Sequence, residues 1–126
     1  MTDRSPQKIT TFLMFEGQAE EALTFYLSLF DDAEVIQAQA GEGQQTIFTL
    51  AGQQFMCLDS SVEHGFSFTP SVSLFVQCES EEEITRLYNA LIEGGEAAMP
   101  LGNYGFSRQY GWLNDRFGVS WQLNLA

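Results

Sequence analysis

The sequence has little of what most metal and redox sites need, with one histidine and two cysteines among 126 residues. A lone His64 cannot supply the several strong ligands of a zinc site, so we interpret it as a surface-loop residue, with a general base or metal ligand as the alternative. Cys57 and Cys78 lie in apolar stretches without C-x-x-C spacing. This pattern predicts reduced, buried thiols and gives no support to a redox role.

Basic residues are also scarce. Five lysines and arginines face seventeen acidic residues, for a formal net charge of −12. Such a chain repels the phosphates of nucleic acids and anionic membrane surfaces, so we expect neither as a partner. No apolar run approaches the roughly 20 residues that span a bilayer, and the first residues lack the apolar segment of a secretory signal. We therefore expect a cytoplasmic location.

What the sequence does contain is a globular amount of apolar residues, 44% with eleven Phe, arranged in short periodic segments. Apolar spacing predicts a helix over residues 18–30, and Ser80 with Glu83 forms a capping box that begins a second helix, which Gly94-Gly95 ends. Alternating or β-branched stretches predict the strands. These cover residues 9–15, 34–39, 45–50, 54–59, 72–78, 96–99, 110–114 and 119–125.

The order of these elements repeats. A shift of 62 positions places Thr11 on Ser73 and Tyr26 on Tyr88, which indicates two βαβββ units at about 8–60 and 70–126 within one domain, 1–126. The predicted class is α+β. The two units are expected to form a curved, mostly antiparallel sheet with helices outside, around a concave cleft that suits a ligand.

Four stretches resemble a known family: KITTFLMFEGQAEEALTFYLSLF, FTLAGQQFMCLDSS, FSFTPSVSLFVQC and YGWLNDRFGVSWQLNL. They are similar to the PhnB-like branch of the vicinal oxygen chelate superfamily, which includes glyoxalase I, extradiol dioxygenases and bleomycin-resistance proteins. The branch is often named for a demethylubiquinone methyltransferase. This sequence, however, lacks a glycine-rich turn after its first strand with an acidic residue about 20 positions on, the pattern of a nucleotide-type cofactor site.

The resemblance also implies where a divalent metal would be held, by His and Glu from strands of both halves. The first ligand position falls on Thr11 and its repeat partner on Ser73. The glutamate that ends the pattern D-x-x-G-x-x-x-E falls on Gln122, and the related position of the first half falls near Met56. These neutral side chains leave a divalent charge uncompensated, so we expect no metal and no cofactor.

We therefore predict a ligand-binding cleft lined by Thr11, Met56, Ser73 and Gln122, with Trp112 as part of its wall and Trp121 in the core. The alternative for Gln122 and Ser73 is that they satisfy each other inside a filled barrel. The face on which Trp112 lies is left open by the sequence. Arg108 is either an anchor for an acidic ligand or an exposed arginine.

Two functions follow. The first is small-molecule binding in the cleft without a metal, with no catalytic residue assigned. The alternative is a metal-dependent or metal-free enzyme of glyoxalase or dioxygenase type, a lyase, isomerase or oxygenase, whose ligands could include Glu42, Asp59 or His64. We also expect a homodimer, as in the superfamily, because short sheets leave edges that a two-fold partner can cover.

Overall fold

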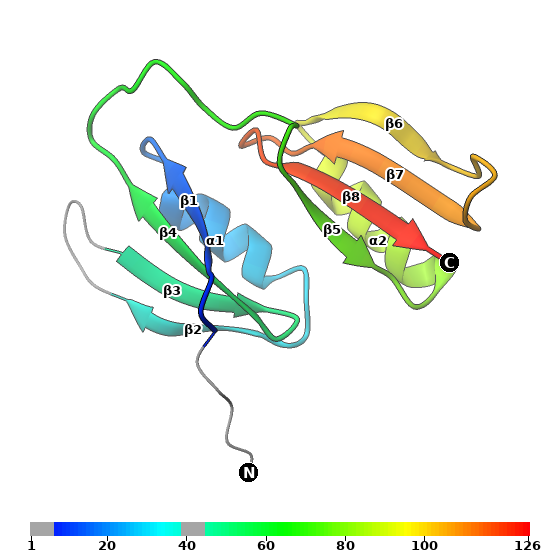
Figure 1. The fold of residues 1–126 in the computed structure, drawn as a ribbon, viewed down its shortest axis with the longest axis horizontal. Coiled ribbons are helices and arrows are strands. Elements are labelled where there is room, and N and C mark those ends of the chain that lie inside the picture. Colours follow the sequence, from blue (N-terminus) through cyan, green and yellow to red (C-terminus); the bar gives the residue numbers. More distant parts are fainter. Residues whose placement is uncertain (1–6, 39–44) are drawn as a thin grey trace, which may run out of the picture. The chain divides into compact units, whose positions relative to one another are not determined.

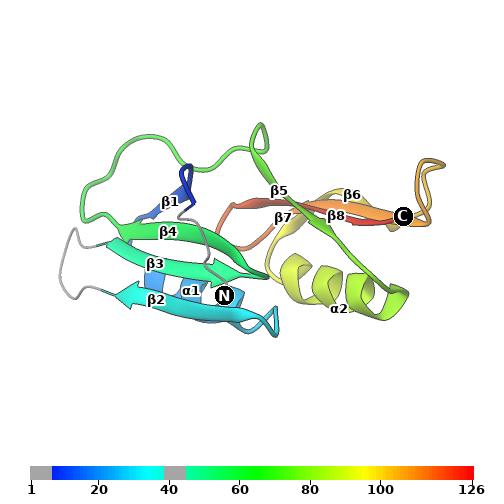
Figure 2. The same cartoon turned by 60° about the horizontal axis from the view of Figure 1, so that its bottom comes forward.

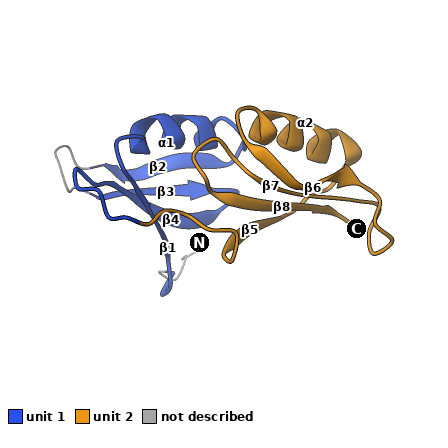
Figure 3. Ribbon diagram, turned by 90° about the horizontal axis from the view of Figure 1, so that it is seen from above, with its two compact units in different colours: residues 1–65 blue, residues 66–126 orange. Residues whose placement is uncertain are grey.

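The computed structural model describes residues 7–38 and 45–126, and the chain separates into two compact units, residues 1–65 and 66–126 (Figure 3). The boundary falls in the connection between the two predicted repeats. In the described part of the chain, each unit combines one helix with a four-stranded sheet (Figure 1). The strands thus form two mixed sheets, one in each βαβββ unit, in an α+β fold.

The first unit contains β1 (Thr11–Phe15), α1 (Ala19–Leu27), β2 (Ala33–Ala38), β3 (Gln45–Leu50) and β4 (Gln53–Asp59). Its sheet has the order β1-β4-β3-β2, in which β1 and β4 are parallel and the other neighbours are antiparallel. Helix α1 covers one face (Figure 3). The core under it contains Phe48 stacked on Phe55, with ring centroids 5.6 Å apart, together with Ala22 and Tyr26 from the helix.

The second unit repeats this topology with β5 (Ser73–Gln77), α2 (Glu81–Ile92), β6 (Glu96–Gly102), β7 (Gln109–Asn114) and β8 (Ser120–Leu125). Its sheet has the order β5-β8-β7-β6, and β5 is parallel to β8. The equivalent strands occupy equivalent places in both sheets. The duplication predicted from the sequence is confirmed.

The ends of α2 follow the predicted capping signals. Ser80 Oγ accepts a hydrogen bond from Glu83 N at 3.0 Å, and Glu83 Oε1 accepts one from Glu79 N at 2.7 Å. The carboxylate thus reaches one residue further back than in the usual reciprocal box. Gly94 has φ +75°, a conformation that glycine adopts without strain, and the helix has ended before it.

Strand alternation separates the two faces of the second sheet. Helix α2 lies on one side of this sheet (Figure 2). The sheet residues on the α2 side are buried, as are Ile84, Leu87 and Leu91 of the helix. Trp121 is 1% exposed and lies on this side, as predicted for a core residue. The opposite side of the sheet is free of α2, and we call it the distal face.

No helix among the described residues is long and apolar enough to cross a membrane.

Both cysteines are free thiols and buried, as predicted. Burial raises the pKa of the Cys57 and Cys78 thiols from 9.0 to about 11, with smaller contributions from Asp59 and Glu83 respectively. Because the thiolate is the nucleophile, we expect iodoacetamide at mildly alkaline pH to alkylate the native chain about 100-fold more slowly than the chain in urea. Mass spectrometry at timed intervals measures both rates. Equal rates would contradict the burial.

The same shift has a consequence for stability. The unfolded chain releases the thiol protons at lower pH than the native chain does. The two protonated, buried thiols therefore make their full contribution to the free energy of unfolding below pH 9.0. We expect the free energy of unfolding to fall as the pH rises from 9.0 to about 11. A Cys57→Ala, Cys78→Ala double variant should lose less stability over this interval, which urea titrations at each pH would measure.

Candidate functional site

A tight turn between β7 and β8 fixes the strand that carries Gln122. Asp115 is 3% exposed, and its Oδ1 accepts hydrogen bonds from Phe117 N at 2.9 Å and Val119 N at 3.0 Å. Its Oδ2 accepts one from Trp121 Nε1 at 2.9 Å. Gly118 supplies the positive φ, +94°, that the turn requires. Asp115 therefore holds the turn and the start of β8 together and sets the faces of the residues that follow.

Three strands of the distal face are neutral, whereas the edge strand β6 adds the exposed Glu96, the register partner of Asn114. Alternation along β8 puts Trp121 under the helix and Gln122 on the distal face, and the strand pairings extend this pattern to β5 and β7. The side chains of these three strands on the distal face carry no charge, although the chain as a whole has a net charge of −12. They are Ser73, Phe75, Gln77, Tyr110, Trp112, Asn114, Ser120, Gln122 and Asn124.

One hydrogen-bonded group on this face connects three strands. Trp112 Nε1 donates to Ser120 Oγ at 2.9 Å, and Ser120 Oγ lies 2.7 Å from Ser73 Oγ. Ser120 is 1% exposed, whereas Ser73 and Trp112 are only partly buried. Ser73 and Trp112 therefore share this face, which settles the orientation of Trp112.

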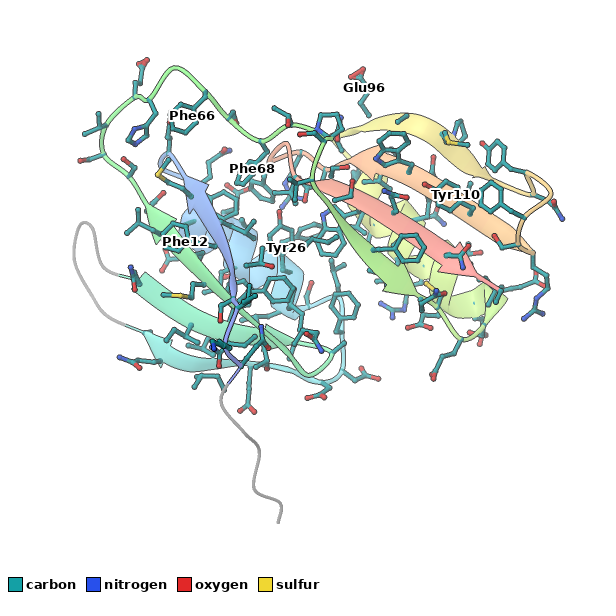
Figure 4. The ribbon with its side chains drawn as sticks, in the orientation of Figure 1. Phe12, Tyr26, Phe66, Phe68, Glu96 and Tyr110 are labelled. Carbon is teal, nitrogen blue, oxygen red and sulfur yellow. The ribbon has the colours of Figure 1, made fainter. Side chains whose placement is uncertain are left out.

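A second group contains Gln122. The Tyr110 hydroxyl donates to Gln122 Oε1 at 2.5 Å, and Tyr110 (Figure 4) is also in edge contact with Phe106 and Tyr104, at centroid distances of 5.1 and 6.2 Å. Desolvation, and secondly Tyr104, raises the pKa of the Tyr110 phenol, so the hydroxyl keeps its proton. Gln122 is bonded to Tyr110 and not to Ser73. The alternative in which Gln122 and Ser73 satisfy each other is therefore not what the structure contains.

The Arg108 side chain is hydrogen-bonded to the backbone of Ala126. Its Nε donates to Ala126 O at 3.0 Å. Nearby, Ser107 Oγ donates to Asn124 Oδ1 at 2.7 Å, and Asn124 Nδ2 donates to Gln77 Oε1 at 3.0 Å. These bonds tie the β6–β7 connection to β8 and β5, so the described contacts give Arg108 a structural partner.

Thr11 and Met56 both belong to the first unit, but they lie on opposite faces of its sheet. Thr11 alternates with Leu13 and Phe15, which are buried on the α1 side, whereas Met56 is paired with Phe12 on the other side. Phe12, 45% exposed and labelled in Figure 4, is the β1 residue next to Thr11 that lies on the side away from α1. The shift of 62 positions aligns the helices, but it pairs Thr11 on the helix side of its sheet with Ser73 on the distal face. An error of one residue is enough to move a side chain to the opposite face.

The remaining proposed metal ligands do not gather. Asp59 Oδ1 accepts from Gly17 N at 2.7 Å and from Ala19 N at 3.3 Å, which is a cap on the start of α1. His64 Nε2 lies 2.8 Å from Ser60 Oγ in the loop after β4. Glu42 lies outside the described residues. Within 7–38 and 45–126, no three His, Cys, Asp or Glu side chains are close enough to hold a metal ion together.

The divalent metal that the superfamily implies does not fit the donors of the second unit. Gln122 Oε1 already accepts from Tyr110, and Ser73 Oγ is bonded to Ser120 Oγ. Neither residue brings the negative charge or imidazole nitrogen that divalent ions prefer. These donors therefore do not make a divalent metal site.

Several members of the distal face were not predicted from the sequence. Ser120 links Ser73 to Trp112, and Tyr110 orients Gln122, yet neither was assigned to the site. Strand alternation could have found some of them. Ser120 lies two residues before Gln122 and Asn124 two residues after it, so both must share its face in a strand. Phe75 is the register partner of Gln122 on β5, so predicting its place on this face would also have required the strand order of the sheet.

Comparison with known proteins now adds to this geometry. A model of the 3-demethylubiquinone-9 3-methyltransferase family matches residues 7–124. The chain belongs to this family. Among curated proteins, none is detectably similar to it.

Solved structures place this family member in a wider fold group. A PhnB protein from Bacillus cereus is 53% identical, with a TM-score of 0.91 over 95% of this chain and 100% of that one. PA1353 from Pseudomonas aeruginosa is 26% identical, with a TM-score of 0.74 over 95% and 98%. A glyoxylase/bleomycin resistance protein/dioxygenase domain from Frankia sp. EAN1pec is 14% identical, with a TM-score of 0.72 over 98% and 99%, which shows the fold alone. The protein is PhnB-like and has the glyoxalase fold, which confirms the resemblance.

Proposed function

We propose that the chain binds a neutral small organic molecule on the distal face of its second sheet, without a metal ion. One observation carries this proposal: three adjacent strands present only neutral polar and aromatic side chains there, in a protein with a net charge of −12. A face that served only for solubility would be expected to share the acidic residues. A neutral face with fixed hydrogen-bonding groups suits an uncharged ligand.

Aromatic side chains support a flat ligand. Phe75 is 52% exposed and lies beside Gln122 in the strand register, while Trp112 is held in place by its bond to Ser120. Tyr104 and Phe106, 43% and 64% exposed, stack at a centroid distance of 6.3 Å next to Tyr110. Exposed rings with fixed orientation give contact area at a small entropic cost.

Methyl transfer, the activity in the family's name, is not part of this proposal. A methyl transferase needs a site for its methyl donor, and the sequence has no glycine-rich turn after β1 of the kind that cradles a nucleotide-type cofactor. On β5, β7 and β8 the distal face offers hydrogen bonds and stacking but no charged side chain that could act as nucleophile or strong base.

The test uses the two tryptophans as internal reporters. We expect millimolar indane, 1-indanone or coumarin to shift the indole N–H resonance of Trp112, which lies on the distal face, in a nitrogen-15 NMR titration. The resonance of Trp121 should stay in place, because that indole is buried and bonded to Asp115. Trp112→Phe assigns the two signals. If none of the three compounds moves the Trp112 signal, the proposal fails.

The enzyme alternative is tested by metal. Because a ligand stabilises a fold only if it binds the native state, zinc, nickel, cobalt and manganese should leave the melting temperature almost unchanged. Gln122→Glu should not restore binding, since Ser73 still offers only a hydroxyl and several strong ligands are needed together. About one transition-metal ion per chain after dialysis, without a histidine tag, or turnover of dicarbonyl adducts or catechols, would favour the enzyme instead.

A further inference from the structure

The direction of the hydrogen bonds on the distal face can be assigned from the groups themselves. An indole N–H only donates, so Ser120 Oγ accepts from Trp112 at 2.9 Å. Ser120 is 1% exposed, and the acceptor within reach of its own hydrogen is Ser73 Oγ at 2.7 Å. Leaving this buried donor unpaired is unfavourable, so Ser120 donates to Ser73. The hydroxyl hydrogen of Ser73 is then available at the surface of the face.

Gln122, like Ser73, is left as a hydrogen-bond donor toward the surface of the face. Tyr110 keeps its proton and donates it to Gln122 Oε1, which fixes the amide with its oxygen toward Tyr110. The amide nitrogen is left with two hydrogens, and no hydrogen bond from it is found within the described residues. Gln122 is only partly buried, so these donors can reach a ligand.

The two donors lie close together. Ser73 is opposite Ser120 in the strand register, and Gln122 is two residues further along β8, opposite Phe75. Strand spacings put the two backbone positions about 8 Å apart, with the half-exposed ring of Phe75 beside them. A flat ring placed on Phe75 would have one or two of its edge oxygens near these hydrogens.

We propose that the Ser73 hydroxyl and the Gln122 amide form a donor pair that selects neutral planar ligands bearing oxygen acceptors, such as aryl ketones, lactones or quinones, over hydrocarbons of the same shape. The inference rests on the proposed function and adds the chemical class of the ligand. The Trp112 bond acts on Ser73 through Ser120 and leaves Ser73 as a hydrogen-bond donor. The Tyr110 bond leaves Gln122 as a donor in the same way. The face therefore disfavours a donor group of the ligand and favours a carbonyl oxygen.

The experiment compares 1-indanone with indane, which differ by one carbonyl oxygen. In NMR titrations that follow the Trp112 indole, 1-indanone should bind at least tenfold more tightly than indane. Gln122→Glu retains an acceptor for Tyr110 but removes the donors, and should lower the affinity for 1-indanone about tenfold while leaving indane unchanged. Ser73→Ala should act in the same direction.

Gln77→Glu is the matched control, because it adds the same charge to the same face on β5 but lies outside the donor pair. It should leave the affinity for 1-indanone within about twofold. Equal loss in Gln77→Glu and Gln122→Glu would mean simple charge effects and would overturn the inference. Equal affinities of indane and 1-indanone for the wild-type chain would overturn it while leaving the proposed function in place. An unmoved Trp112 signal with both compounds and with coumarin as well would overturn both proposals. An unchanged Trp121 signal in each variant confirms that the turn at Asp115 is intact.

Discussion

Asp115→Ala should lower the free energy of unfolding by about 4 kcal/mol, because a buried carboxylate that accepts three hydrogen bonds is removed. The N–H groups of Phe117 and Val119 and the indole of Trp121 would be left without their acceptor. Truncation also opens space beside the buried Trp121 ring. Urea unfolding followed by circular dichroism measures the change.

The control for this variant is Asp31→Ala. Asp31 is an exposed aspartate between α1 and β2, and its removal should change the free energy of unfolding by no more than about 0.5 kcal/mol. If Asp115→Ala unfolds at the same urea concentration as Asp31→Ala, the turn does not depend on the carboxylate.

Gly95→Ala should cost about 3 kcal/mol or more, for a steric reason. A Cβ at Gly95 would lie 2.2 Å from the carbonyl oxygen of Asn114 and 3.0 Å from backbone atoms of Asp115. These are backbone atoms at the end of β7, which cannot move aside as a flexible side chain can, so β6 and β7 would have to separate. Thermal unfolding measures the loss.

Gly102→Ala is the matched control in the same strand pair. The nearest atoms to a Cβ there are 3.9 and 4.0 Å away, an ordinary contact distance. We expect a change within about 0.5 kcal/mol. If the Gly95→Ala variant were as stable as Gly102→Ala, the backbone at Asn114 would be able to move away from the added Cβ, and the steric prediction would be wrong.

Much of the fold could be predicted from the sequence, because the deciding interactions are local. Ser80 and Glu83 cap a helix through atoms only a few residues apart, and Gly94 ends it through its own backbone. Asp115 and Gly118 form a turn within four residues. Apolar periodicity then predicts the strands and helices, and the repeated order of these elements predicts the duplicated unit.

The face shared by three of the predicted residues also follows from the sequence. Gln122, Ser73 and Trp112 were expected at a ligand site, and the structure brings them to one face of one sheet. Alternation alone carries this result for Gln122, since its neighbour Trp121 had to enter the core. The neutral character of the position is a property of the residue type and needs no coordinates.

Other features were decided by the tertiary structure. Thr11 lies on the α1 side of its sheet whereas Ser73 lies on the distal face, so the shift of 62 that aligns the helices puts β1 and β5 out of phase. No local signal reports a one-residue difference. The donor character of the distal face was equally hidden in the sequence. Serine and glutamine can both donate and accept, and it is the register of β5, β7 and β8 that brings Trp112 to Ser120 and Tyr110 to Gln122 and so fixes which role each side chain keeps for a ligand.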